Sequence, residues 1–257
     1  MRAFIAQLSS ALAALALAGA ARSEPRSTAW LEDPRVEPVG ETETGFAFEY
    51  QAPDLKALRQ GFRLLELRFP AGVAGGLEAA PAFELRQRAE EGLELRALGA
   101  ELRGRVLGAA ESPLVVVYGG YANDLGAERD HLFRAGGAGR YDFGRWFVAA
   151  DLRLSSGLGG DLDSAWEAWV GAAAARRFFR NDELNAGLES FMVVPLAGSR
   201  LSDPVFGQAA ESRSFYYGPS VALRVRPLWT SFSAATGLLL SDAASDLLVR
   251  WNVGIEH

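Results

Sequence analysis

The chain has 257 residues, of which 49% are hydrophobic and 23% charged, and its net charge is −6 at pH 7. The length suits one large β domain or two small ones, and the composition argues against wholesale disorder. The acidic balance argues against nucleic acid as a partner, because phosphate binding requires a basic surface. Cysteine is absent, which excludes disulfides, thiolate metal ligands and thiolate nucleophiles. The mean hydropathy of +0.03 excludes a helical membrane protein, but strands that alternate lipid-facing and lumen-facing residues average to such a value.

The N-terminus has the pattern of an export signal. Arg2 supplies a positive start, residues 11–17 an apolar core, and Ala18-Gly19-Ala20 a small-residue cleavage site. The sequence therefore predicts a signal peptide over residues 1–20 and an acidic, proline-containing leader over residues 21–43. Such a leader would either plug the lumen of a barrel or serve as a periplasmic tether.

Strand-like segments follow one another from residue 44 to the C-terminus. Twelve of them alternate apolar with polar or small residues, over 45–51, 61–70, 81–88, 92–108, 113–123, 131–143, 145–156, 164–179, 182–194, 214–227, 228–240 and 245–257. In the segment 92–108, Leu95, Leu98, Leu102 and Val106 also form a helical stripe, so we expect a strand with a bulge near Gly99. Most segments match the roughly 9 to 11 residues of a tilted strand that crosses a bilayer.

The lengths of the connections differ systematically between alternate positions. When the connections are numbered in chain order, the odd-numbered ones, including the longest at 195–213, would lie at one rim. The even-numbered connections, which would lie at the other rim, are all short. This segregation is typical of bacterial outer-membrane barrels, and an even strand number returns both termini to one rim. The sequence thus predicts an all-β fold over residues 44–257: a single closed antiparallel up-and-down transmembrane β-barrel of about 12 strands. A soluble secreted β-sandwich is the alternative fold.

The alternating strands and the terminal segment "LLVRWNVGIEH" resemble Gram-negative outer-membrane β-barrel proteins, although His257 stands where such proteins usually end in an aromatic residue. The resemblance implies an outer-membrane location, with membrane lipid and the barrel-assembly machinery as partners. The stretch at 92–108 followed by "PLVVVYGGY" is also loosely similar to uncharacterised putative transporter barrels of the phenol-degradation type.

Two sets of candidate site residues follow from the alternation. The inward set contains the charged residues on the polar sides of strands: Glu84, Arg86, Glu94, Arg96, Asp151, Arg153, Glu183, Glu189, Arg224, Arg226, Arg250 and Glu256. The outward set, facing lipid or forming an aromatic girdle, contains Phe215, Tyr217, Val221, Leu223, Trp229, Val249, Trp251 and Val253.

Catalytic and metal-binding patterns are weak. His131 beside Asp130 is best explained as a surface-loop histidine, and Asp161 with Asp163 supplies too few oxygens for calcium. We therefore expect no enzymatic activity, no metal and no cofactor. The predicted function is a channel or transporter for small polar or anionic solutes, with Arg224, Arg226 and Arg250 favouring anions. The alternative is a filled-lumen barrel with a structural or surface-interaction role, in which the inward charges form ion pairs.

Overall fold

The computed structural model describes residues 28–32, 34–52, 62–87, 92–108, 113–125, 131–158, 165–179, 184–197, 214–225, 227–239 and 246–257. It contains thirteen strands: β1 (Glu43–Ala52), β2 (Phe62–Arg68), β3 (Ala71–Ala74), β4 (Leu77–Gln87), β5 (Glu94–Leu107), β6 (Leu114–Asp124), β7 (His131–Phe143), β8 (Trp146–Leu158), β9 (Ala165–Arg177), β10 (Leu184–Ala197), β11 (Ser214–Val225), β12 (Leu228–Leu239) and β13 (Leu247–Glu256). Among the described residues, no helix is long and apolar enough to cross a membrane.

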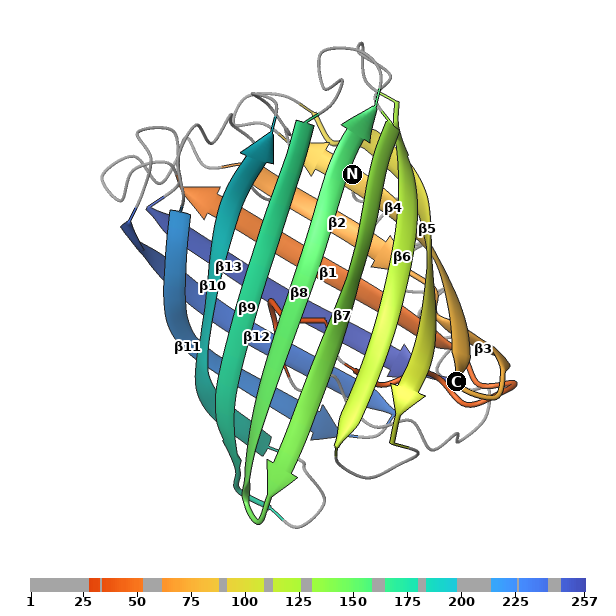
Figure 1. The fold of residues 1–257 in the computed structure, drawn as a ribbon, viewed down its shortest axis with the longest axis vertical. Coiled ribbons are helices and arrows are strands. Elements are labelled where there is room, and N and C mark those ends of the chain that lie inside the picture. Colours follow the sequence, from red (N-terminus) through yellow and green to blue (C-terminus); the bar gives the residue numbers. More distant parts are fainter. Residues whose placement is uncertain are drawn as a thin grey trace.

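Twelve of the strands close into one antiparallel barrel (Figure 1). Apart from β2 and β3, consecutive strands pair with one another; β2 pairs with β4 and β1 pairs with β13, so the ring has no free edge. Closure satisfies the backbone hydrogen bonds of every strand, which is the condition for a sheet to lie in hydrocarbon. The predicted fold class and the twelve predicted strands are confirmed.

β3 is an additional strand that the alternation did not indicate, because residues 71–76 read as a turn. It forms a short hairpin with β4 through Gly75 and Gly76, and Gly76 has a φ of 79°, a left-handed conformation that favours glycine. The β7–β8 connection has the same length and places Gly144 at a φ of 63°. We call the end of the barrel that carries these turns and the C-terminus the turn rim. The opposite end is the loop rim, to which the longest connection, residues 198–213, belongs.

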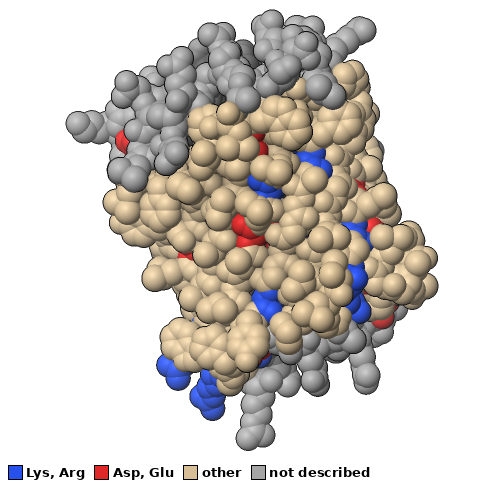
Figure 2. Space-filling model, viewed as in Figure 1, with Lys and Arg blue, Asp and Glu red and all other residues tan. Residues whose placement is uncertain are grey.

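The outer face of the barrel is apolar between its rims. In β11 every second residue is buried, and the residues between them, such as Tyr217, Val221 and Val225, are 41%, 43% and 65% exposed. Large exposed hydrophobic side chains recur in the same phase in most of the other strands, and the face shown in Figure 2 is mostly uncharged, with scattered charged atoms between the two ends. An apolar exterior on a closed sheet is stable only in contact with lipid.

The ambiguous segment 92–108 is strand β5, and two bulges explain its helix-like spacing. The pairing with β4 shifts at Leu95–Ala97, and the pairing with β6 shifts at Arg105–Leu107. The first bulge moves Leu95 to the outer face together with Leu98. All four residues of the helix-like stripe, Leu95, Leu98, Leu102 and Val106, are therefore exposed on that face. The expected bulge at Gly99 is therefore displaced by a few residues, and Ala97, which the alternation placed outward, is buried.

The N-terminal part of the described chain lies inside the barrel rather than in the sheet. Residues 34–42 run towards the turn rim, where Val39 and Thr42 form single bridges with the β3 hairpin. Pro34 and Pro38 have no N–H to donate to a neighbouring strand, so this stretch does not extend the ladder that begins at β1. In Figure 1 the red end of the chain is visible between the front and back walls.

The exterior assignment predicts a depth-dependent effect of charge on stability. Val221→Arg, near the middle of β11, is expected to lower the free energy of unfolding by about 2–4 kcal/mol, because the guanidinium would sit in hydrocarbon. Val225→Arg, on the same face at the turn rim, should cost only about 0–1 kcal/mol. Reversible denaturant unfolding in lipid bilayers measures both; equal effects would contradict the membrane orientation.

Candidate functional site

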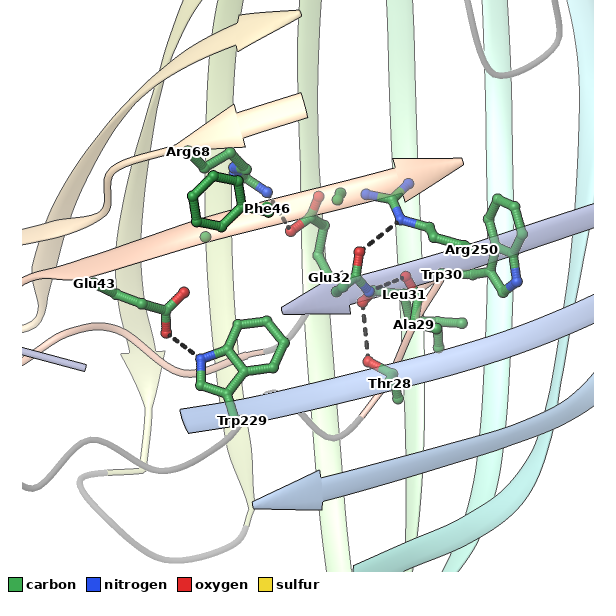
Figure 3. A pocket seen from close by; sticks show the side chains of 13 residues that line it. Thr28, Ala29, Trp30, Leu31, Glu32, Glu43, Phe46, Arg68, Trp229 and Arg250 are labelled. Carbon is green, nitrogen blue, oxygen red and sulfur yellow. Dashed lines mark hydrogen bonds and ion pairs between the residues drawn. The ribbon is translucent and has the colours of Figure 1, made fainter. Parts of the chain in front are cut away.

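Residues 28–32, which we call the plug segment, lie inside the barrel, next to side chains such as Arg68, Trp229 and Arg250 of the wall (Figure 3). All five side chains are buried, with exposures between 4% and 9%. The segment has no regular secondary structure, so its peptide groups need partners from the barrel wall.

Glu189, an inward residue of β10, binds the backbone of the plug segment. Its two carboxylate oxygens accept the N–H groups of Ala29 and Trp30, each at 2.8 Å, and its side chain is almost fully buried. Hydrogen bonds to a charged, buried acceptor contribute about 1.5–3 kcal/mol each, more than bonds between neutral groups. This carboxylate was predicted to face inward, but its role as an anchor for the leader was not.

Polar side chains of β12 and β13 bind the carbonyl groups of the same segment. Asn252 Nδ2 donates to Ala29 O at 3.0 Å, and Ser231 Oγ donates to Thr28 O at 3.2 Å. Asn252 also donates to Ser231 Oγ at 3.0 Å, which orients the two wall groups towards the segment. The plug segment is therefore bound by specific hydrogen bonds as well as by apolar contact.

The carboxylate of Glu32 meets three guanidiniums, which we call the three-arginine site: Arg68 of β2, Arg103 of β5 and Arg153 of β8. Glu32 Oε2 lies 3.5 Å from Arg68 Nη1 and contacts Arg103 Nη2, and Oε1 lies 3.5 Å from Arg153 Nη2. Arg103 is 1% exposed, so its charge depends on these partners in the absence of water.

Carboxylates of the wall balance the same guanidiniums. Glu101 lies 2.6 Å from Arg68 and 2.7 Å from Arg103, and Asp151 lies 3.4 Å from Arg153. Asp151 additionally accepts the N–H of Glu32 at 3.1 Å. Each of the three guanidiniums therefore has at least one wall carboxylate as a partner in addition to Glu32, as buried charges require.

The lumen wall next to Arg153, formed by β9, β10 and β11, is aromatic. The Phe191 ring lies 5.1 Å from that of Trp30, 5.3 Å from that of Trp169 and 5.1 Å from that of Tyr216. Gly171 provides space for the plug segment, since a Cβ at that position would lie 3.1 Å from Leu31 Cγ. The plug segment thus contacts an apolar part of the wall through Trp30 and Leu31, and an ionic part of the wall through Glu32.

Two spaces lined by described residues border the plug segment. One lies towards the turn rim and is lined by Glu43, Trp229 and Asn252; the other lies towards the loop rim and is lined by Glu84 and Arg134. Glu32, Arg68 and Arg250 line both spaces. The ionic contact of Glu32 is therefore part of the partition between them.

The predicted inward charges occupy several environments. Those buried or half-buried on the inner side are Glu84, Arg86, Arg96, Asp151, Arg153, Glu189, Arg224, Arg250 and Glu256. Glu94 pairs in register with Arg86 but is exposed at the loop rim. The side chains of Glu183 and Arg226 lie outside the described residues.

Arg224 and Arg250 do not form one cationic cluster. Arg224 lies at the turn rim, 2.8 Å from Glu256, and Arg250 lies deeper, 3.5 Å from Glu49 and 3.7 Å from Glu66. Each is balanced by its own carboxylates, so the proposed cooperation of these two arginines in attracting anions has no geometric basis.

Most of the predicted outward residues are on the outer face, but Trp229 is not. Phe215, Tyr217, Val221, Leu223, Val249, Trp251 and Val253 are exposed or half-buried in the outward phase of their strands. Trp229 is 2% exposed inside the barrel, where its Nε1 donates to Glu43 at 3.0 Å. The prediction for Trp229 is wrong, because position at a strand end was taken as a sign of the girdle although Leu228 occupies the outward phase.

Sequence reasoning missed Arg68, Glu101, Arg103, Glu78 and Arg134 as inward charges, and Glu32 as the residue that meets them. Glu101 and Arg103 alternate with Leu102 and Gly104, so their phase was readable once a bulge is placed before Ala97. No signal in the sequence marks Glu32, because its partners come from β2, β5 and β8.

His131 is the first residue of β7 rather than part of a loop. Its Nδ1 lies 2.6 Å from the Tyr121 hydroxyl, and both residues are exposed on the outer face near the loop rim. Within the described ranges, no group of three or more histidines and acidic residues could hold a metal ion. Asp130, Asp161 and Asp163 lie outside the described residues.

No family model matches the chain, and no curated protein matches it. Among solved structures, an outer-membrane channel from Pseudomonas putida F1 is 12% identical with a TM-score of 0.55, over 88% of this chain and 98% of that one. The NanC porin is 7% identical with a TM-score of 0.53, over 83% and 98%. The translocator domain of the autotransporter NalP from Neisseria meningitidis is 10% identical with a TM-score of 0.50, over 84% and 87%.

The chain has the fold of outer-membrane β-barrel proteins. Together with the apolar exterior of a closed sheet, this fold places the protein in the cell outer membrane, as predicted. The loose similarity to phenol-degradation-type transporters receives no support from these comparisons.

The anchoring of the plug segment predicts a local effect of Glu189→Gln. A glutamine has one acceptor oxygen and no charge, so it cannot accept both N–H groups as the carboxylate does. The amides of Ala29 and Trp30 should then lose roughly 10- to 100-fold in hydrogen-exchange protection, the equivalent of about 1.5–3 kcal/mol. The matched variant Glu256→Gln, which breaks the pair with Arg224 elsewhere in the lumen, should leave these two amides protected.

Proposed function

We propose that the protein is an outer-membrane channel for small polar or anionic solutes, with the plug segment as its internal gate. The observation that carries the proposal is the construction of the partition. Residues of the N-terminal leader, rather than the barrel wall alone, line the two spaces in the lumen, and residues 28–32 are held by side chains of at least six strands.

The lining of the space towards the loop rim supports polar solutes. It contains the carboxylates of Glu66 and Glu84 and the guanidiniums of Arg134, Arg153 and Arg250. Charged groups along a pore set which ions and solutes enter, because the low-dielectric wall focuses their field.

Arg134 supports a preference for anions. Within the described part of the chain its guanidinium forms no ion pair, in contrast to Arg68 and Arg153, so its positive charge faces the space. An anion arriving from the loop rim would meet this charge before it reached the plug segment.

If the plug segment is a gate, removal of its side chains is expected to increase the conductance of the channel. Replacement of residues 28–32 by glycine and serine keeps the length of the chain but removes Trp30, Leu31 and Glu32. Single-channel conductance in planar bilayers is expected to rise at least about twofold, because the constriction then contains no fixed side chains. A folded barrel, identified by its heat-dependent electrophoretic mobility, that carries no current with or without the plug segment would support a closed structural role instead.

The role of Arg134 predicts a change in selectivity. Arg134→Glu should lower the preference for chloride over potassium by a factor of about two or more, measured as a shift of the reversal potential in a salt gradient. Arg176, which is exposed outside the barrel beside Trp146, is the control. Arg176→Gln should leave the reversal potential unchanged, and equal shifts in both variants would contradict the assigned pathway.

A further inference from the structure

The three-arginine site has the geometry of a receptor for a single carboxylate. Its guanidiniums come from three different strands, and Arg68 Nη1, Arg103 Nη2 and Arg153 Nη2 all point to the carboxylate of Glu32. Guanidinium is the side-chain group best suited to such recognition, because its planar N–H donors match the two oxygens of a carboxylate.

We propose that the three-arginine site binds the carboxylate of a small organic acid, and that Glu32 occupies the site as an internal competitor. The proposal rests on the function proposed above, since it names the solute class and the means of opening. When the plug segment leaves, the wall carboxylates Glu66, Glu78, Glu101 and Asp151 remain beside the arginines, but the three N–H donors that faced Glu32 lose that acceptor. A solute carboxylate restores the same contacts.

The aromatic wall defines the rest of the solute. Departure of the plug segment also removes Trp30 from Phe191 and Leu31 from Gly171, leaving an apolar surface beside the arginines. Glu101 and Asp151 would repel a second carboxylate nearby. The site therefore fits one carboxylate attached to an apolar body, and a dicarboxylate fits less well.

One buried donor of the plug segment is unsatisfied, which lowers the cost of displacing the segment. Trp30 Nε1 is buried and, among the described residues, has no hydrogen-bond partner. A buried donor without an acceptor costs about 1–3 kcal/mol relative to its hydrated state. The solute must compete with Glu32, which is tethered to the barrel through the chain. The apparent association constant of the solute is therefore its intrinsic association constant multiplied by the fraction of barrels in which the site is vacant.

Competition gives a direct test by calorimetry on the full-length barrel in detergent, with 3-phenylpropionate as the probe. Glu32→Gln removes the charge of the competitor and is expected to strengthen binding at least about tenfold. Adding Arg103→Gln to that variant should weaken binding about tenfold or more, whereas adding Arg140→Gln should not. Arg140 is an equally buried lumen arginine that pairs with Asp142.

The controls separate charge, shape and folding. 3-Phenylpropionamide, which has the same body without the charge, should not bind measurably, and acetate should bind more weakly than 3-phenylpropionate. Heat-dependent mobility verifies each barrel, and Arg153→Gln replaces Arg103→Gln if the latter does not fold. Equal affinity of the wild-type protein and Glu32→Gln, or binding that survives loss of a site arginine, would overturn the proposal.

Binding and conduction are measured independently, so the two proposals fail separately. Calorimetric binding with the expected variant pattern in a barrel that carries no current would overturn the channel and keep the site. Current without binding of 3-phenylpropionate to Glu32→Gln would overturn the site and keep the channel.

Discussion

The closed sheet is the constraint on which the other features of this molecule depend. In hydrocarbon each backbone N–H and C=O must be paired within the protein, and joining β1 to β13 and β2 to β4 achieves this without an edge. Closure then gives every strand one face towards lipid and one towards a narrow interior. Most charged side chains of the spanning strands share that interior, and they pair across strands, as Arg68 does with Glu101.

The wall residues also present hydrogen-bond donors and acceptors to the lumen, and the plug segment binds to groups of both kinds. Glu189 presents acceptor oxygens to the lumen, and the backbone N–H groups of Ala29 and Trp30 donate to them. The three-arginine site presents donors, and Glu32 supplies the acceptor. The wall and the leader are therefore complementary in charge at two separate points, whereas a barrel closed by its own side chains would satisfy them within the wall.

The sequence predicted what periodicity and length determine, and it failed where distant residues meet. Strand number, the outward face of β11 and the bulged nature of β5 follow from local alternation, which the pleat converts directly into faces. Trp229 was misassigned because position in the chain was given more weight than phase. The plug segment was left as one of two alternatives, because nothing in "TAWLE" reveals that Ala29 will lie beside Glu189, 160 residues away. Contacts of that separation are set by the closure of the barrel, which no local pattern encodes.

The two parts of the wall also explain how the orientation of residues 28–32 in the lumen is fixed. Trp30 and Leu31 face β8–β11, where the interior is aromatic, and Glu32 faces the charged interior of β2, β5 and β8. Neither wall alone would fix the segment: an aromatic surface is not directional, and an ionic site binds one residue. Together they orient three consecutive side chains and thereby the backbone between them. A solute that replaces the segment must satisfy both walls at once, which gives selectivity to an interior whose individual interactions are common to many barrels.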